Sequence, residues 1–141
     1  MKTKNYSLLL VAFALILALG ILHFSAIFFY FYWTLWWFDT MMHFLGGLSI
    51  GMFIIWVSSK AGFLGVGIPP RGRAMTVVLI LIAVIGVGWE VFEYIFNIAK
   101  STEDSYVLDT IADLVADMVG GFTAVIVGRK GLFYKYEPEN V

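Results

Sequence analysis

Four long apolar stretches, separated by short polar or aromatic segments, dominate the pattern of hydrophobic and polar positions along the chain. They cover about residues 6–33, 39–59, 75–98 and 107–128. A helix needs roughly 20 apolar residues to cross the hydrocarbon core of a bilayer, so each stretch is long enough to span it. The pattern therefore predicts an all-α, polytopic membrane protein, in which residues 1–141 form a single domain built as a four-transmembrane-helix bundle.

The segments between these stretches have the composition of turns. Residues 28–38 read FFYFYWTLWWF, and such rings are typical of the membrane–water interface, where the chain has to reverse. Residues 60–73 combine glycines, two adjacent prolines and basic side chains, which indicates a loop. The first stretch begins like a secretory signal peptide, but its apolar run is longer than a signal core of about 7–15 residues. We therefore expect a transmembrane helix there.

The basic residues fall almost entirely on one side of this four-span topology. One side carries Lys2, Lys4, Lys60, Arg71, Arg73, Arg129, Lys130 and Lys135, and the other side carries only Lys100. Cytoplasmic segments of membrane proteins carry an excess of Lys and Arg. The sequence thus predicts a multi-pass protein of the inner or plasma membrane, with both termini and the middle loop in the cytoplasm.

Composition supports the membrane assignment and removes several classes of function. The chain is 61% hydrophobic and 13% charged, whereas soluble domains are about one-quarter charged. It contains no cysteine, which excludes disulfides, thiolate metal ligands and a cysteine nucleophile. The sequence has no nucleotide-binding loop, nucleophile elbow, zincin motif or basic patch for nucleic acid. The lipid bilayer is therefore the one partner that composition predicts.

Acidic residues interrupt the last apolar stretch at a regular interval. Asp109, Asp113 and Asp117 are four residues apart, so a helix places them along one stripe. Small residues suited to close helix packing form a ladder on the adjoining surface, at Ala112, Ala116, Gly120 and Ala124. Since acids within a membrane helix are expensive and usually functional, this stripe is the first candidate site.

Two other stretches carry polar residues at what the topology makes the same, outer half of the membrane. Asp39 and His43 share the four-residue spacing at the start of the second stretch, and Glu90 and Glu93 lie on one face of the third. His23 lies on the first stretch, where a structural histidine is the simpler interpretation. We therefore expect the acids and His43 to converge, with His23 as a further candidate.

Six carboxylates gathered in a low-dielectric environment need compensation. Bound cations, shared protons or a water-filled vestibule would each supply it, and no Lys or Arg lies inside these helices to form ion pairs. Imidazole together with carboxylate suits zinc, manganese or iron, whereas carboxylates alone suit magnesium or calcium. The expected ligands of such a divalent metal ion are Asp39, His43, Glu90, Asp113, Asp117 and His23.

The segments DTMMHFLGG, GWEVFEY and LDTIADLVADMVGG follow one another on successive stretches. In this order they resemble the YjdF-like family of small bacterial membrane proteins and, more distantly, VanZ-like proteins. The resemblance covers about the last three helices and leaves His23 outside it. It implies a functional set but no particular reaction, and the set is Asp39, His43, Glu90, Glu93, Asp109, Asp113 and Asp117.

Three hypotheses for function follow from these residues. The first is a metal-dependent hydrolase or transferase acting on a lipid or cell-envelope intermediate, with Glu93 or Asp109 as the catalytic base. The second is a cation or proton transport or channel subunit, which predicts a homo-oligomer joined through glycine-rich helix faces. The third is a structural membrane subunit with hydrated acids. Because the cytoplasmic halves of the first, third and fourth helices are almost entirely apolar, the sequence favours binding or catalysis over transport, and whether the protein is an enzyme stays open.

Overall fold

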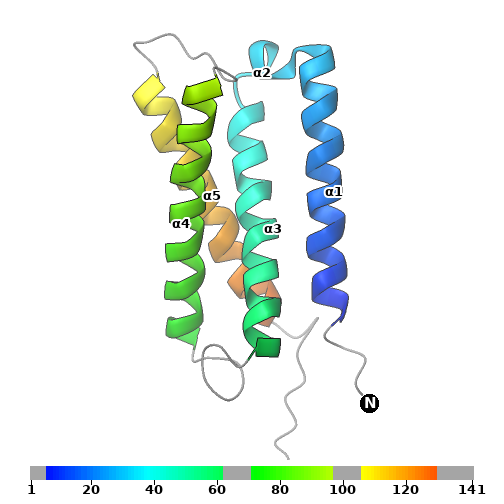
Figure 1. Cartoon of the computed structure of the whole chain (residues 1–141), viewed down its shortest axis with the longest axis vertical. Coiled ribbons are helices and arrows are strands. Elements are labelled where there is room, and N and C mark those ends of the chain that lie inside the picture. Colours follow the sequence, from blue (N-terminus) through cyan, green and yellow to red (C-terminus); the bar gives the residue numbers. More distant parts are fainter. Residues whose placement is uncertain (1–5, 62–70, 97–105, 130–141) are drawn as a thin grey trace, which may run out of the picture.

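The computed structural model describes residues 6–61, 71–96 and 106–129, all but a few of which are helical (Figure 1). The helices are α1 (Tyr6–Phe29), α2 (Phe31–Thr34), α3 (Phe38–Ala61), α4 (Arg71–Phe96) and α5 (Tyr106–Arg129). All except α2 contain an apolar span of 21 to 23 residues, long enough to cross a membrane. The predicted all-α fold with four transmembrane helices is confirmed.

The first helix is shorter than the sequence predicts. It ends at Phe29, because Tyr30 adopts a left-handed conformation with φ 62° and becomes the N-cap of the single turn α2. That conformation is uncommon for residues other than glycine, and no Gly or Pro marks the break in the sequence. The chain still reverses inside the aromatic run, where Tyr32 packs edge-on against Phe38 with ring centres 5.2 Å apart.

The other helices begin or end a few residues from their predicted bounds. The helix α4 begins at Arg71, four residues before the expected start, and α3 and α5 exceed their predicted ranges by one or two residues at each end. The basic Lys2, Lys4, Lys100, Lys130 and Lys135 lie outside the described residues. The cytoplasmic position of the termini therefore stays a prediction.

The helices α3 and α5 form the most extensive contact in the bundle, and glycines make it close. A methyl group added at Gly47 would meet the main-chain carbonyl of Asp117, and one at Gly120 would meet the carbonyl oxygen of Phe44. A methyl group at Gly51 would lie 2.7 Å from Cβ of Ala124. The sequence predicted that these glycine-rich faces join two copies of the chain. In the structure the face of α3 packs against the face of α5 within one chain.

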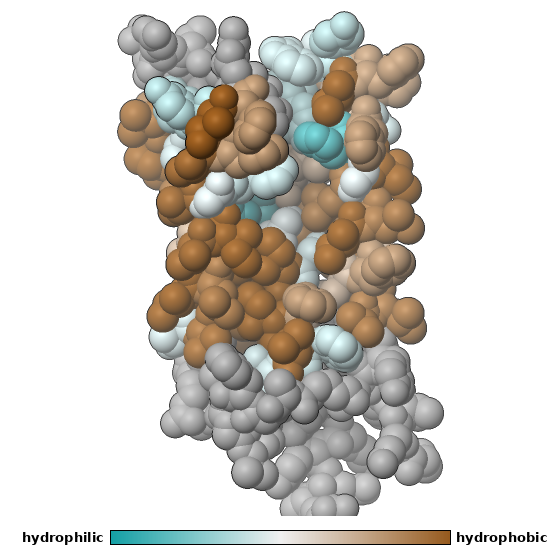
Figure 2. Space-filling model, in the orientation of Figure 1, coloured by the Kyte–Doolittle hydropathy of each residue, from teal (hydrophilic) through white to brown (hydrophobic). Residues whose placement is uncertain are grey.

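The bundle has an apolar half and a polar half. Two buried clusters fill the apolar half: Ala12, Met52 and Ala124 in one, and Val78, Ile82 and Val125 in the other. The helix α1 packs mainly on α3, while α4 packs on α5 and α3, so α1 and α4 lie on different sides of α3 (Figure 1). The described surface is largely apolar, and its hydrophilic side chains lie mainly near the ends of the bundle and in a recess in its upper half (Figure 2).

Candidate metal centre

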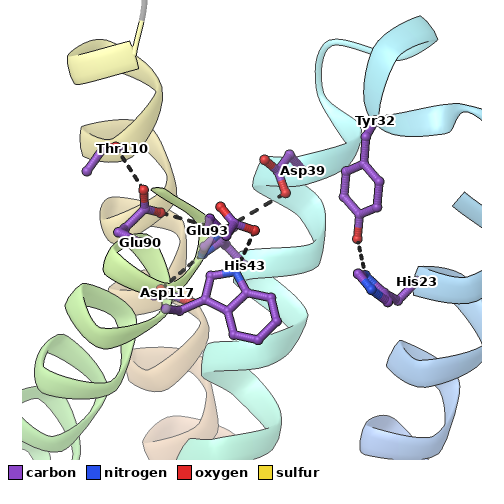
Figure 3. A network of polar contacts seen from close by, with 9 residues as sticks. His23, Tyr32, Asp39, His43, Glu90, Glu93, Thr110 and Asp117 are labelled. Atoms are coloured by element: carbon purple, nitrogen blue, oxygen red, sulfur yellow. Dashed lines mark hydrogen bonds and ion pairs between the residues drawn. The ribbon is translucent and has the colours of Figure 1, made fainter. Parts of the chain in front are cut away.

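His43 lies at the centre of the polar half and links three helices. Its side chain extends from the second turn of α3 and is 5% exposed. Nδ1 lies 3.1 Å from Oδ2 of Asp117 on α5, in a buried hydrogen bond (Figure 3). Nε2 faces the opposite way, 3.8 Å from Oε1 of Glu90 on α4 and 4.0 Å from Oδ1 of Asp39, one turn earlier on α3. The predicted convergence of acids from separate helices on His43 is therefore present.

Two groups of side chains in this cluster have the spacing of metal ligands. One consists of Asp39, His43 and Asp113, the other of His43, Glu90 and Glu93, and within each group one ligand atom per residue lies within 4.8 Å of the others. Two ligands on opposite sides of an ion are about 4.4 Å apart, twice a bond of about 2.2 Å. Both groups contain His43, so this histidine is the residue most central to a possible metal site.

Three buried atoms of this cluster have no hydrogen-bond partner. They are Nε2 of His43, Oε1 of Glu90 and Oδ1 of Asp113. Leaving a buried polar atom unpaired costs about 1–3 kcal/mol, and more if it carries charge. All three atoms belong to residues that also form the groups with ligand spacing. A cation held by either group would give a partner to atoms that lack one, so the residues present fit a metal ion.

Two neighbouring side chains, neither expected from the sequence, orient the glutamates. The hydroxyl of Thr110 donates a hydrogen bond of 2.8 Å to Oε2 of Glu90, and the indole N–H of Trp89 donates one of 2.7 Å to Oε1 of Glu93. Thr110 thereby leaves the other oxygen of Glu90 facing His43. The sequence signal for both was helical spacing: Trp89 is four residues before Glu93, and Thr110 is three before Asp113.

Glycines make room for Asp117. A methyl group at Gly86 on α4 would lie 2.7 Å from Oδ2 of Asp117, and one at Gly46 on α3 would lie 3.8 Å from its Oδ1. Asp117 was expected to be a metal ligand, yet Oδ2, the oxygen that Gly86 accommodates, is the one bound to His43 Nδ1. Asp117 therefore fixes the position of the imidazole ring through this hydrogen bond. Asp117 itself belongs to neither group with ligand spacing.

His23 and Asp109 are not among the residues that have ligand spacing. Nδ1 of His23 is hydrogen-bonded to the hydroxyl of Tyr32 at 2.8 Å, and His23 is in neither group with ligand spacing (Figure 3). Asp109 is half-buried and also in neither group. Burial, together with the nearby charges of Asp39 and Glu93, raises the pKa of Tyr32, so its hydroxyl stays protonated beside His23. Sequence reasoning assigned Tyr32 only to the aromatic belt.

A cavity of about 340 Å³ adjoins the cluster. Asp39, His43, Glu93 and Asp117 line one part of it, and Tyr32 and His23 contribute further polar atoms. The rest of the lining is mostly aliphatic and comes from α1, α3 and α4. The site therefore combines buried polar groups with an apolar space large enough for part of an organic molecule.

Comparison with known proteins places the chain in a family without identifying a reaction. No curated protein and no solved structure matches the chain. A family model described as a predicted membrane protein, DUF2238, matches residues 2–132. This match is consistent with the resemblance to YjdF-like proteins without confirming that name, and no comparison supports the resemblance to VanZ-like proteins. Since the match covers nearly the whole sequence, the chain belongs to the DUF2238 family of predicted membrane proteins.

Proposed function

We propose that this membrane protein binds one divalent ion of zinc, manganese or iron between α3, α4 and α5, and uses it for hydrolysis or group transfer on a lipid or cell-envelope intermediate. The observation that carries the proposal is that His43, Glu90 and Asp113 each bring to the cluster a buried atom without a hydrogen-bond partner. His43 is the shared ligand of the ion, with Asp39 and Asp113 in one group that has ligand spacing and Glu90 in the other. By the distribution of basic residues, the site lies in the outer half of the membrane.

The orientation of His43 supports a transition metal over magnesium or calcium. A metal-binding histidine usually donates its second ring N–H to a carboxylate, which fixes the tautomer and leaves the other nitrogen free to bind. Asp117 is in position to accept that bond from Nδ1, and Nε2 is the unpartnered nitrogen that faces Glu90. An imidazole nitrogen is a ligand typical of zinc, manganese or iron sites, whereas magnesium and calcium prefer oxygen.

The carboxylates around the ion suit hydrolytic chemistry. A bound divalent ion polarises a carbonyl or phosphoryl oxygen and makes a water molecule acidic enough to act as a nucleophile. Glu93 is the best placed base, because it is buried, lies within ligand distance of His43 and is oriented by Trp89. Its role is to take the proton from that water. Asp109, the other predicted base, is more exposed and outside the ligand groups, so we rank Glu93 ahead of it.

The test is elemental analysis of the purified protein in detergent. We expect about one zinc, manganese or iron per chain, lost in His43→Ala and in Asp113→Ala. The control is His23→Ala, which removes an imidazole near the cavity but outside both ligand groups and should keep the metal. Well-folded wild-type protein that takes up none of the three metals after incubation with them would overturn the proposal.

Transport is the weaker candidate. The half of the bundle away from the cluster is filled by the apolar clusters around Met52 and Ile82. In the described residues, no buried Asp, Glu or His continues from His43 toward that end. A transport path would need such groups or water along its whole length. Cation flux into liposomes that is lost in Asp113→Asn would reverse this ranking.

A further inference from the structure

The cavity beside the cluster is amphipathic along its length. Asp39, His43 and Glu93 line it together with the aliphatic side chains of Leu19 and Ile50, and Ile50 lies about two turns further along α3 than His43. Its volume of about 340 Å³ is near the lower limit for pockets that bind small organic ligands, about 300–1,000 Å³. It therefore suits part of one hydrocarbon chain together with the polar group attached to it, and is too small for a whole two-chain lipid.

The cavity lies between α1 and α4 and reaches the lateral surface of the bundle. Leu19 on α1 and Ile85 on α4 both line it, although these two helices pack mainly on other partners. Ile85 and Trp89 line the cavity and are also 46% and 43% exposed, so we place its mouth beside them. Both residues lie inside the candidate membrane span of α4, so we expect the mouth to face lipid. In Figure 2 a recess with hydrophilic colour lies between apolar surfaces.

We propose that this cavity takes one hydrocarbon chain of a bilayer lipid sideways between α1 and α4, and so places the polar group of that lipid at the His43 cluster. The inference rests on the proposed function, and it narrows the substrate to a lipid drawn from the plane of the membrane. The interior of a bilayer is as apolar as the cavity wall, so the chain alone gives little selectivity. Selection among lipids comes from the polar group and its contacts with the cluster and the bound ion.

Two glycines provide matched variants. Gly20 lines the cavity on α1, and an added Cβ there has no atom within 4 Å, so Gly20→Leu fills cavity space without displacing neighbours at its Cβ. Gly88 on α4 has the same freedom but does not line the cavity, which makes Gly88→Leu the control. Both changes replace a helical glycine by a good helix former, so both should preserve folding.

The experiment is photolabelling in vesicles of phosphatidylethanolamine and phosphatidylglycerol that contain a phosphatidylethanolamine with a diazirine on one acyl chain. Labelled positions are mapped by mass spectrometry of peptides. Met42 and Ile50 lie on the central helix α3, are half-buried and line the cavity, so they report a chain inside it. Val84 is 66% exposed and outside the cavity lining, so it reports the surrounding bilayer lipid.

We expect labelling of Met42 and Ile50 in the wild type, a several-fold loss in Gly20→Leu, no loss in Gly88→Leu, and equal labelling of Val84 in all three. Equal labelling of the cavity positions in Gly20→Leu and Gly88→Leu would overturn the inference. Metal content measured on the same samples separates the two proposals. If the metal content is normal but Gly20→Leu does not reduce labelling of the cavity positions, only the lipid site is refuted. If the protein is free of metal but Gly20→Leu does reduce that labelling, the lipid site is supported and only the ion is refuted.

Discussion

Replacing Asp117 by Asn should weaken metal binding without abolishing it. The carboxylate accepts a hydrogen bond from His43 Nδ1 at 3.1 Å, and this bond keeps the lone pair of Nε2 directed at Glu90. An Asn side chain can instead turn its amide toward Nδ1, which favours the tautomer with a proton on Nε2 and competes with the metal. Loss of such a supporting carboxylate typically costs 10–100-fold in metal affinity, or about 1.4–2.8 kcal/mol.

The measurement is competition between the purified protein and a fluorescent zinc chelator, which gives the dissociation constant directly. Asp109→Asn is the matched control, because it makes the same chemical change two turns earlier on α5, outside both ligand groups. His43→Ala sets the limit for loss of a ligand. We expect the Asp117→Asn affinity to fall between these two, and the thermal unfolding midpoint without metal to change far less than the affinity.

Either of two results would refute the reasoning. An unchanged affinity in folded Asp117→Asn protein would mean that the His43–Asp117 bond does not control the ring. A loss as complete as in His43→Ala would mean that Asp117 binds the ion itself, as the acid spacing in the sequence first predicts. X-ray absorption at the metal edge separates the mechanisms further, since a supporting role leaves the count of nitrogen and oxygen ligands unchanged.

Three further outcomes are expected. Gly120→Ala should lower the unfolding midpoint, because the added methyl meets the carbonyl of Phe44, whereas Gly88→Ala, with open space around its Cβ, should leave it unchanged or raise it. Tyr32→Phe removes the hydroxyl that contacts His23 and should cost about 0.5–1.5 kcal/mol of stability while leaving the metal content unchanged. Acidifying the buffer should release the metal in a titration followed by the chelator, since protons compete for the imidazole and carboxylate ligands.

The acid stripe on the last helix shows how far the sequence could predict the site. A spacing of four residues drifts by about 40° per step on a helix of 3.6 residues per turn, so Asp109 and Asp117 differ by about 80° in direction. In the structure Asp113 and Asp117 are buried in the cluster, and Asp109 stays half-buried outside it. The sequence therefore predicted which helices converge, but the division of tasks between neighbouring acids depends on how α5 is rotated against α3.

The first helix marks a second limit of the sequence. The break at Tyr30 has no Gly or Pro signal, so hydropathy extends the helix through the aromatic run. That break places Tyr32 beside His23 and makes both part of the cavity lining. The space between α1 and α4 likewise depends on which helices pack together, and no single stretch of sequence encodes that choice. The cavity, and with it the inference about lipid, required the structure.

The packing of α3 against α5 connects the small residues to the chemistry. Gly47 lies against the main chain of Asp117, and Gly120 lies against the carbonyl of Phe44, the residue after His43. These two backbone contacts flank the His43–Asp117 hydrogen bond and hold the helices close enough for it to form at 3.1 Å. A larger residue at either glycine would push the helices apart and lengthen that hydrogen bond, although the new side chain would not contact a metal ligand itself. The glycines and the acids are separate motifs in the sequence. In the structure they act together, because both determine the position of the His43 ring.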